Sequence, residues 1–308
     1  MILEGKRIWV AGNGMVGKSV IKKLKKLDVE IFTESKKILD LRDPDSTRKY
    51  LKKIKPDLII LSAAKVGGIL ANDSYPVDFL YDNIAISSNV INQAHLADVD
   101  NLVFLGSTCI YPRDCQQPIK EDYLLTGPLE KTNQWYAIAK IAGIKLVEAF
   151  RKQYKRRYIS VLPTNLFGPH DNFDTMNGHV IPSLMAKIHE AKIQKKEKFN
   201  VWGSGIAKRE FLFVEDLADG IIFLAENYDS DEIINIGSRD ELTIKELCLL
   251  LKKVINYEGD FQFDSSKPDG TLRKKTDLSK INALGWKAKT NLEEGLSKTY
   301  KWFVNNYG

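Results

Sequence analysis

The sequence predicts an α/β fold in which helices cover both faces of a doubly wound parallel sheet, with a smaller, mixed α/β domain toward the C-terminus. Two observations carry this prediction. Throughout the first half of the chain, short apolar runs alternate with longer segments whose apolar residues recur at helical spacing. After residue 162 this alternation gives way to a loop rich in Pro, Gly, Asn and Asp, which indicates a second structural unit.

The strand and helix candidates of the first half follow one another in regular order. Five short, mainly apolar runs are typical of strands buried on both faces, at residues 8–11, 29–32, 58–61, 102–105 and 159–162. Four segments between them are predicted helices, at residues 16–27, 45–54, 77–97 and 135–154. Strand–helix–strand units of this kind join parallel strands through right-handed crossovers.

The second half is less regular. A loop at 163–177 and a basic, helix-like stretch precede a strand at 233–236, a helix at 243–255, a turn at 267–270 and a closing helix at 292–305. Thr243 and Glu246 fit a capping box at the start of the predicted helix at 243–255. We predict one domain from residues 1–165 with about 212–236, and a second from about 166–211 with 237–308.

Composition excludes several classes of protein. With 308 residues, 44% hydrophobic and 28% charged, the chain has an ordinary globular composition. The net charge of +6 is modest and spread along the chain, which suits a small anionic ligand and does not indicate nucleic acid. Three cysteines without paired spacing argue against a disulfide framework, and the absence of a CxxC motif or a His-rich cluster argues against a structural zinc site. No signal-peptide core or membrane-length apolar run is present, so we expect a cytoplasmic location without membrane contact.

A glycine motif joins the first predicted strand to the first predicted helix. It reads Gly12-Asn13-Gly14-Met15-Val16-Gly17, a G-x-G-x-x-G pattern. In a Rossmann-type fold the first glycine allows a tight turn, the second lets a pyrophosphate approach the backbone and the third lets helix pack on strand. The helix N-terminus then attracts the anion. Its place between strand and helix favours a dinucleotide site over a purely structural turn.

Side chains after the second strand should contact the adenosine ribose of such a dinucleotide. Glu34 accepts hydrogen bonds from a free 2′-hydroxyl and repels a 2′-phosphate, whereas Lys36 and Lys37 attract the phosphate. These residues by themselves leave NAD and NADP both open.

Ser107, Tyr136 and Lys140 are predicted to form a catalytic triplet for hydride transfer. Tyr136 and Lys140 lie one helical turn apart and therefore share a helix face. The lysine ammonium is expected to lower the pKa of the phenol, which makes the tyrosine a proton donor or acceptor near neutral pH. Ser107 follows the fourth strand, at the edge where such sheets bind ligands. The sequence therefore predicts a nicotinamide-dependent enzyme.

Longer strings along the chain identify a family. They occupy residues 63–69, 106–112, 136–143, 163–173, 179–182, 201–205, 209–212 and 267–271. Together they closely resemble the GDP-L-fucose synthase family of extended short-chain dehydrogenases/reductases, over essentially the whole chain. The resemblance implies epimerisation of C3 and C5 of GDP-4-keto-6-deoxy-D-mannose, followed by reduction of C4 with NADPH to give GDP-L-fucose. The first predicted domain then binds NADP(H) and the second the GDP-sugar.

The resemblance also implies that Cys109 and His179 form the acid/base pair of the epimerisation. A thiol and an imidazole suit this role because their pKa values lie on either side of neutrality. Judged from the residues alone, Cys109 would sooner be a small buried residue and His179 a loop histidine.

Carried over by position, the remaining contacts fall into two groups. The resemblance implies cofactor contacts at Gly12–Gly17, Glu34, Asp40, Leu41, Ala63, Ala64, Leu105, Gly106, Ser107, Thr108, Tyr136, Lys140, Pro163, Thr164, Asn165, Leu166 and His179. It implies substrate contacts at Lys187, Trp202, Arg209 and Asp269. It further implies a homodimer that pairs the helices at 77–97 and 135–154 into a four-helix interface.

The sequence departs from the family pattern at the cofactor site. The family's phosphate loop is one residue longer and carries an arginine, where this chain has Asn13, and Glu34 aligns with a second arginine. NADP(H) is the expectation from the family, and NAD(H) stays open as an alternative. Two other functions also remain open: a C4-reductase of a related sugar such as a GDP-6-deoxy-4-keto-heptose, with or without epimerisation, and a non-catalytic nucleotide-binding protein on the same fold.

Overall fold

A parallel sheet of six strands forms the centre of the larger part of the molecule. The structure is a computed structural model that describes residues 1–266 and 271–307. The sheet has the order β2–β1–β3–β4–β5–β9, with every neighbouring pair parallel. Its strands are β1 (Arg7–Ala11), β2 (Glu30–Phe32), β3 (Leu58–Leu61), β4 (Asn101–Leu105), β5 (Arg157–Pro163) and β9 (Ile234–Ile236). All six predicted strands are thus confirmed, and the strand order reverses between β1 and β3, where such sheets bind ligands.

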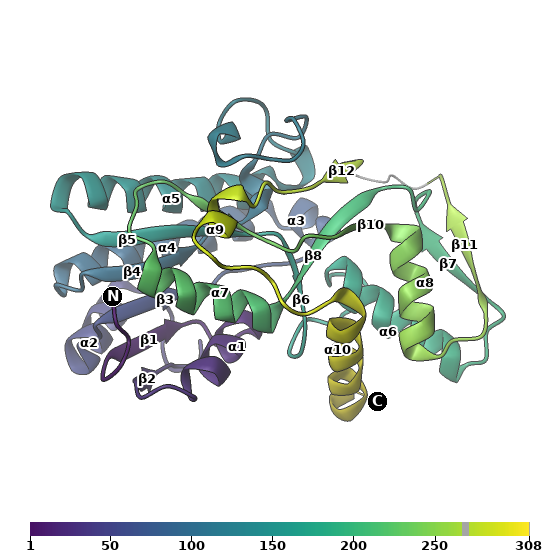
Figure 1. Cartoon of the computed structure of the whole chain (residues 1–308), viewed down its shortest axis with the longest axis horizontal. Coiled ribbons are helices and arrows are strands. Elements are labelled where there is room, and N and C mark those ends of the chain that lie inside the picture. The colour runs from purple at the N-terminus through teal and green to yellow at the C-terminus, as the bar shows by residue number, and fades with distance from the viewer. Residues whose placement is uncertain (267–270, 308) are drawn as a thin grey trace.

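Five helices cover the two faces of this sheet (Figure 1). They are α1 (Met15–Leu24), α2 (Pro44–Ile54), α4 (Pro76–Leu96), α5 (Gln134–Tyr154) and α7 (Val214–Asn227). One hydrophobic cluster joins the sheet to α2, α4 and α5, and a second joins it to α1 and α7. Along β1, Trp9 belongs to the first cluster while Ile8 and Val10 belong to the second. This alternation buries both faces and explains why the strands are mainly apolar.

The smaller part carries a mixed sheet and a separate core, on the right of Figure 1. The mixed sheet pairs β10 (Glu241–Thr243), β8 (Lys208–Phe213), β12 (Arg273–Lys274) and β6 (Asn165–Phe167), and a two-stranded sheet pairs β7 (Lys198–Trp202) with β11 (Asp260–Asp264). A third hydrophobic cluster packs α6 (Val180–Ile193), α8 (Ile244–Ile255) and α10 (Leu292–Tyr307) against β6 and β8. The fold class predicted from the sequence is therefore confirmed, while the domain limits stay a prediction.

Of two predictions for the second half of the chain, the structure confirms one and contradicts the other. The predicted capping box is confirmed, since the Thr243 hydroxyl accepts from the Glu246 backbone N–H at 3.1 Å and the Glu246 carboxylate accepts from the Thr243 backbone N–H at 2.7 Å. The prediction of an uninterrupted loop at 163–177 is wrong, because β6 lies within it. β6 has only three residues and pairs with β8, which is distant in sequence. No local sequence pattern therefore predicts this strand. The predicted turn at 267–270 lies outside the described residues.

Short elements complete the chain. They are α3 (Ile69–Ser74), α9 (Ser279–Ala283) and the 3₁₀ turns η1 (Thr108–Ile110), η2 (Glu121–Tyr123) and η3 (Lys131–Asn133). Among the described residues, no helix has the length and apolar character needed to cross a membrane. Over the same residues, no group of three or more His, Cys, Asp or Glu side chains is arranged to hold a metal ion.

Candidate active site

The carboxyl ends of the parallel strands carry most of the predicted site residues. Gly12 directly follows β1, and Gly106 directly follows β4. Ala63 and Ala64 come shortly after β3, and Pro163 is the last residue of β5. Parallel strands present their carboxyl ends at one edge of the sheet, so these residues line a common edge.

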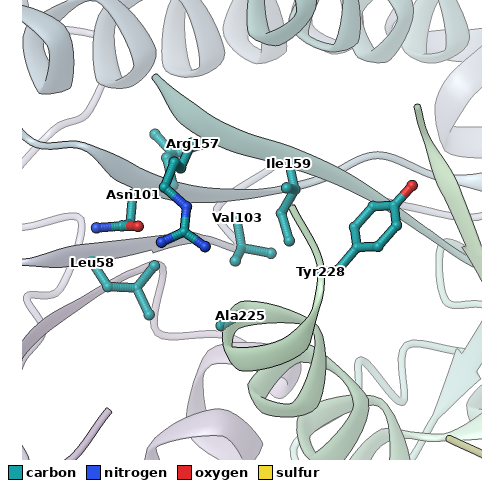
Figure 2. Close-up of a pocket in the computed structure, with 8 residues that line it drawn as sticks. Leu58, Asn101, Val103, Arg157, Ile159, Ala225 and Tyr228 are labelled. Atoms are coloured by element: carbon teal, nitrogen blue, oxygen red, sulfur yellow. The ribbon is translucent and has the colours of Figure 1, made fainter. Parts of the chain in front are cut away.

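A small pocket at the opposite edge of the sheet does not belong to this site. Figure 2 shows Leu58, Asn101 and Arg157 lining it, and these are the first residues of β3, β4 and β5. Tyr228, which follows α7, closes one side. None of the predicted catalytic or binding residues lines this pocket.

The glycine motif forms a tight cradle between β1 and α1. Gly12 has a φ of +131°, and a Cβ there would lie 2.6 Å from the backbone nitrogen of Ala63. A Cβ on Gly17 would lie 1.8 Å from the carbonyl oxygen of Gly12, so helix and strand touch at this point. Gly14 precedes α1 and has open space around it, and the first turn of the helix holds no acidic residue. A strand–helix junction of this shape fits a dinucleotide pyrophosphate.

The segment after β2 combines charges of both signs. Glu34 is half-buried, while Lys36 and Lys37 are exposed. The hydroxyl oxygen of Thr33 is buried and has no hydrogen-bond partner among the described residues. A buried hydroxyl of this kind is suited to a polar ligand group. The structure thus provides groups that favour either form of the ribose.

Asp40 is held by an arginine that the sequence analysis did not single out. The Arg42 guanidinium lies 2.6 Å from the Asp40 carboxylate and 2.9 Å from that of Asp82. Its hydrogen bond lowers the pKa of Asp40 to about 2, so Asp40 is ionised near neutral pH. Leu41, the next predicted contact, packs against the core cluster beneath α2 and α4.

Lys140 is buried beside the other members of the triplet. Its ammonium donates to the carbonyl oxygen of Leu105 at 2.7 Å and lies 5.7 Å from the centre of the Tyr136 ring. Burial lowers the pKa of Lys140 to about 7. Helix α5 begins at Gln134, so both side chains project from its first two turns toward the end of β4.

The prediction that Lys140 lowers the pKa of the Tyr136 phenol is wrong. Burial raises the pKa of Tyr136, the nearby Cys109 raises it further, and a hydrogen bond with Ser107 only partly opposes them. Lys140 instead directs its ammonium to a backbone carbonyl. A high pKa keeps the phenol protonated, which is the form that donates a proton.

Cys109 lies in a positively charged environment. It is the middle residue of η1, and its backbone N–H donates to the Ser107 hydroxyl at 3.2 Å. Burial alone raises the pKa of the thiol, and Lys274, whose ammonium lies 3.7 Å from the sulfur, is the largest opposing influence. Hydrogen bonds to Ser107 and Asn133 and the charge of His179 act in the same direction. The pKa of Cys109 is therefore lowered, as thiolate chemistry requires.

His179 immediately precedes α6 and faces a buried carboxylate. Its Nδ1 lies 3.9 Å from Oδ1 of Asp171, a residue to which the sequence analysis gave no role. Burial alone lowers the pKa of His179, but the neighbouring Asp171 carboxylate and the charge of Cys109 outweigh it and raise the pKa. The structure therefore brings Cys109 and His179 close enough to influence each other's charge.

The predicted substrate residues lie in the smaller part of the molecule. Lys187 extends from α6, with its ammonium 5.7 Å from the centre of the Trp202 ring on β7. Burial lowers the pKa of Lys187, and Asp174 opposes that shift. Arg209 lies on β8 directly beside Lys274 of β12. Asp269 lies outside the described residues.

The segment after β5 links the two parts. The Asn165 amide donates to the carbonyl oxygen of Glu210 on β8 at 2.9 Å, and the Thr164 hydroxyl donates to the same oxygen at 3.4 Å. Leu166 packs against the cluster that includes α1 and α7. The chain therefore passes from the parallel sheet to the mixed sheet directly at the predicted site.

Comparison with known proteins identifies the family of the chain. A family model described as the NAD dependent epimerase/dehydratase family matches residues 8–237. A GDP-L-fucose synthase from Sinorhizobium fredii is 51% identical over 306 residues, covering 99% of this chain and 98% of that protein. A structure of a GDP-6-OMe-4-keto-L-xylo-heptose reductase from C. jejuni has a TM-score of 0.93 at 32% identity and covers 99% of both chains. A GDP-L-fucose synthetase from Naegleria fowleri bound to NADP has a TM-score of 0.91 at 32% identity, covering 100% of this chain and 96% of that chain. With such a match over most of its length, the chain belongs to the NAD dependent epimerase/dehydratase family.

Proposed function

We propose that this protein is an epimerase-reductase that converts GDP-4-keto-6-deoxy-D-mannose to GDP-L-fucose with NADPH. The observation that carries the proposal is the pair Cys109 and His179 beside Ser107, Tyr136 and Lys140. A reductase needs only the triplet, whereas epimerisation also needs a base and an acid. The similarity to a GDP-L-fucose synthase over 99% of the chain supports the choice of sugar.

Cys109 and His179 are proposed to invert C3 and C5 in turn. The 4-keto group acidifies the proton on C3 and the proton on C5. A base can therefore remove either proton, and the sugar then forms an enolate. The Cys109 thiolate removes the proton from one face, and the His179 imidazolium gives a proton to the other. Each inversion leaves a thiol and a neutral imidazole. Return of one proton from sulfur to imidazole, directly or through water, restores the pair for the second centre.

The triplet is proposed to reduce the C4 ketone afterwards. NADPH, when bound, supplies the hydride to C4. Tyr136 gives its phenolic proton to the C4 oxygen, and its raised pKa keeps that proton in place until charge develops on the oxygen. Ser107 donates a hydrogen bond to the same oxygen, and Lys140 holds the first turns of α5 against the end of β4.

The GDP group is proposed to bind across the smaller part. Lys187 and Arg209 supply positive charge for the diphosphate, and the Trp202 ring, which is 62% exposed, supplies a surface for stacking. Asp269 is proposed to accept hydrogen bonds from sugar hydroxyls or from N–H groups of the base. Lysine at position 187 provides charge without the paired donors of an arginine.

NADP(H) is the proposed cofactor, supported by the relative bound to NADP. Lys36 and Lys37 are the exposed cations nearest in sequence to the ribose position. NADH is the second candidate, because Asn13 and Glu34 stand where positive charge is expected. In both cases the residues that hold the pyrophosphate are those of the Gly12–Gly17 cradle.

Reduction of a related GDP-4-keto-heptose is the second candidate function. It is favoured by the TM-score of 0.93 with a heptose reductase. The GDP-L-fucose synthase relative is more similar in sequence, at 51% against 32% identity, and supports the first candidate. The intact triplet and acid/base pair give no support to a non-catalytic nucleotide-binding role.

The protein is proposed to act as a homodimer in the cytoplasm. Val77, Tyr81 and Ile84 form an exposed apolar face of α4 at helical spacing, and Ile138 is exposed on the adjacent α5. Two such faces would pair α4 and α5 of one protomer with those of its partner. A free Cys109 thiol, which the mechanism needs, persists in a reducing compartment.

Deuterium exchange tests the function. Incubation of the enzyme with GDP-4-keto-6-deoxy-D-mannose in D₂O, with NADPH and separately with NADH, should give GDP-L-fucose with deuterium at C3 and C5, identified by NMR. NADPH should give the higher kcat/KM. A Cys109→Ser variant should lose exchange by about 100-fold or more while some reduction remains. A Cys115→Ser variant is the matched control.

Two results would contradict the proposal. A reduced product without deuterium at C3 or C5 would assign the enzyme to the reductases that do not epimerise. Equal loss of exchange and reduction in the Cys109→Ser variant would show that the two steps do not use separate residues.

A further inference from the structure

We infer that Asp171 is a positioning residue for His179, which it holds with Nε2 directed to the sugar and with its proton available for donation. The inference rests on the proposed epimerisation and adds to it a second residue on the acid side. Asp171 does not itself touch the reacting atoms. It acts through the imidazole.

The position of the Asp171 carboxylate supports this role. Its side chain is 4% exposed, and Oδ1 accepts from the Asn172 backbone N–H at 2.7 Å. The same oxygen lies 3.9 Å from Nδ1 of His179. Oδ2 is buried and has no hydrogen-bond partner in the described part of the chain. A buried carboxylate is costly unless a donor or cation compensates it, and His179 is the cationic group placed to do so.

The loop between Asp171 and His179 has a defined conformation. The Asp174 carboxylate accepts from the backbone N–H groups of Met176 and Asn177, at 2.8 and 2.6 Å. A Cβ on Gly178 would lie 2.5 Å from the Asp174 carbonyl oxygen, so the chain closes tightly just before His179. These contacts fix the separation of carboxylate and imidazole.

A second anchor ties this loop to the parallel sheet. The backbone N–H of Gly68, in the segment that follows β3, donates to the Asn177 carbonyl oxygen at 2.8 Å. A Cβ on Gly68 would lie 2.6 Å from the Gly178 carbonyl oxygen. The residues next to His179 are thus held against the edge of the sheet that carries the triplet.

A carboxylate at Nδ1 determines which nitrogen serves the sugar. When Asp171 accepts from Nδ1–H, the remaining nitrogen, Nε2, is left for the substrate. Asp171 also favours the charged imidazolium. The charged groups around His179 are Asp171 on its own loop and Cys109 on η1, and Lys274 on β12 faces the same sulfur. Both acidic partners raise the pKa of His179, against the effect of burial.

A purely structural role for Asp171 makes a different prediction. In that case the carboxylate serves only to accept from the Asn172 N–H. An asparagine keeps an acceptor oxygen of the same shape and removes the charge, so Asp171→Asn separates the two roles. Asp171→Glu restores the charge, and Asp171→Ser gives a second neutral variant if the asparagine variant does not fold.

The test measures the titration of His179 by NMR in the full-length enzyme saturated with NADP. The chain has four histidines, and a His179→Gln variant identifies the signal. In Asp171→Asn the midpoint should move to lower pH. Deuterium exchange at C3 and C5 should fall about tenfold or more, with its alkaline limb moved to lower pH and KM within about twofold. Asp171→Glu should recover part of the His179 midpoint and part of the deuterium exchange. Asp98→Asn, which neutralises an exposed carboxylate just before β4, at the other edge of the sheet, should leave the midpoint unchanged.

The outcomes separate this inference from the proposed function. An unchanged His179 midpoint in a folded Asp171→Asn or Asp171→Ser variant would overturn the positioning role, whatever the activity. Absence of exchange in the wild-type enzyme would overturn the epimerase function, and the positioning role in catalysis with it.

Discussion

At the scale of single residues, the charge of Cys109 depends on groups from four separate segments. Ser107, just before η1, and Asn133, at the end of η3, form hydrogen bonds to it. Lys274 reaches the sulfur from β12, and His179 contributes from the start of α6. No single one of these groups is adjacent to Cys109 in the sequence, so its thiolate character is a property of the folded chain.

Replacing Lys274 by Met should raise the pKa of Cys109, because the nearest positive charge is removed. The thiolate then forms only at higher pH, and the acid limb of the exchange profile moves upward. The pH dependence of alkylation by iodoacetamide, in a Cys115→Ser background with Cys248 buried, measures the thiol directly. Lys287→Met removes an exposed charge elsewhere and is the control. Identical alkylation profiles would show that Lys274 does not stabilise the thiolate.

The sequence predicted the site residues that form local patterns. Tyr136 and Lys140 are one turn apart on a helix, and Ser107 follows a strand, so each is visible in a short window. Cys109 and His179 needed the family resemblance. Lys274 and Asp171 gave no usable signal, because their roles arise from contacts over long separations or from a loop conformation.

At the scale of elements, the junction of β1 and α1 is the most tightly constrained. Gly17 lies where helix and strand meet, and its missing side chain is the reason they meet so closely. The strands of the parallel sheet were predictable because burial on both faces favours runs that are mainly apolar. β7 has only one fully buried residue and β6 only three residues, so neither produces such a run. Their positions follow from pairing with distant strands.

Replacing Gly17 by Ala should destabilise the protein and weaken cofactor binding. The new Cβ would lie 1.8 Å from the Gly12 carbonyl oxygen, so the backbone must move. We expect a loss of about 1–3 kcal/mol in the free energy of unfolding, typical of overpacking. Denaturant unfolding measures the first effect, and titration with NADPH measures the second. Gly14→Ala, with open space around its Cβ, should change the unfolding free energy by less than about 0.5 kcal/mol. Equal stability of both variants would contradict the packing argument.

At the scale of the whole molecule, two surfaces are suited to binding: the cations of the smaller part and the exposed apolar face of α4. The smaller part carries Lys187 beside Trp202 and Arg209 beside Lys274, and these cations are the proposed contacts of the GDP-sugar. The exposed apolar face of α4 lies on the helix layer that contains α5 and α2 (Figure 1). Val77 is 73% exposed and Tyr81 66%, values that favour a protein partner over water.

A double variant, Val77→Asp with Tyr81→Asp, should be a monomer. Charges on this face cannot be buried in a symmetric interface without a large desolvation cost. Sedimentation velocity should show a dimer for the wild-type protein and half that mass for the variant. Leu249→Asp, on the exposed side of α8, should leave the mass unchanged. A monomeric wild-type protein would contradict the proposed dimer.

The sequence by itself determined the parallel sheet and the glycine turn between β1 and α1, and it predicted the triplet Ser107, Tyr136 and Lys140. These depend on periodicity and on spacing within single elements, which the chain carries locally. Only the tertiary structure decided the protonation chemistry of the site. Burial and distant charges set the pKa values of Tyr136, Cys109 and His179, and burial raised the pKa of the phenol that Lys140 was expected to lower. Electrostatic interactions act between neighbours in space, and neighbours in space are fixed only when the chain folds.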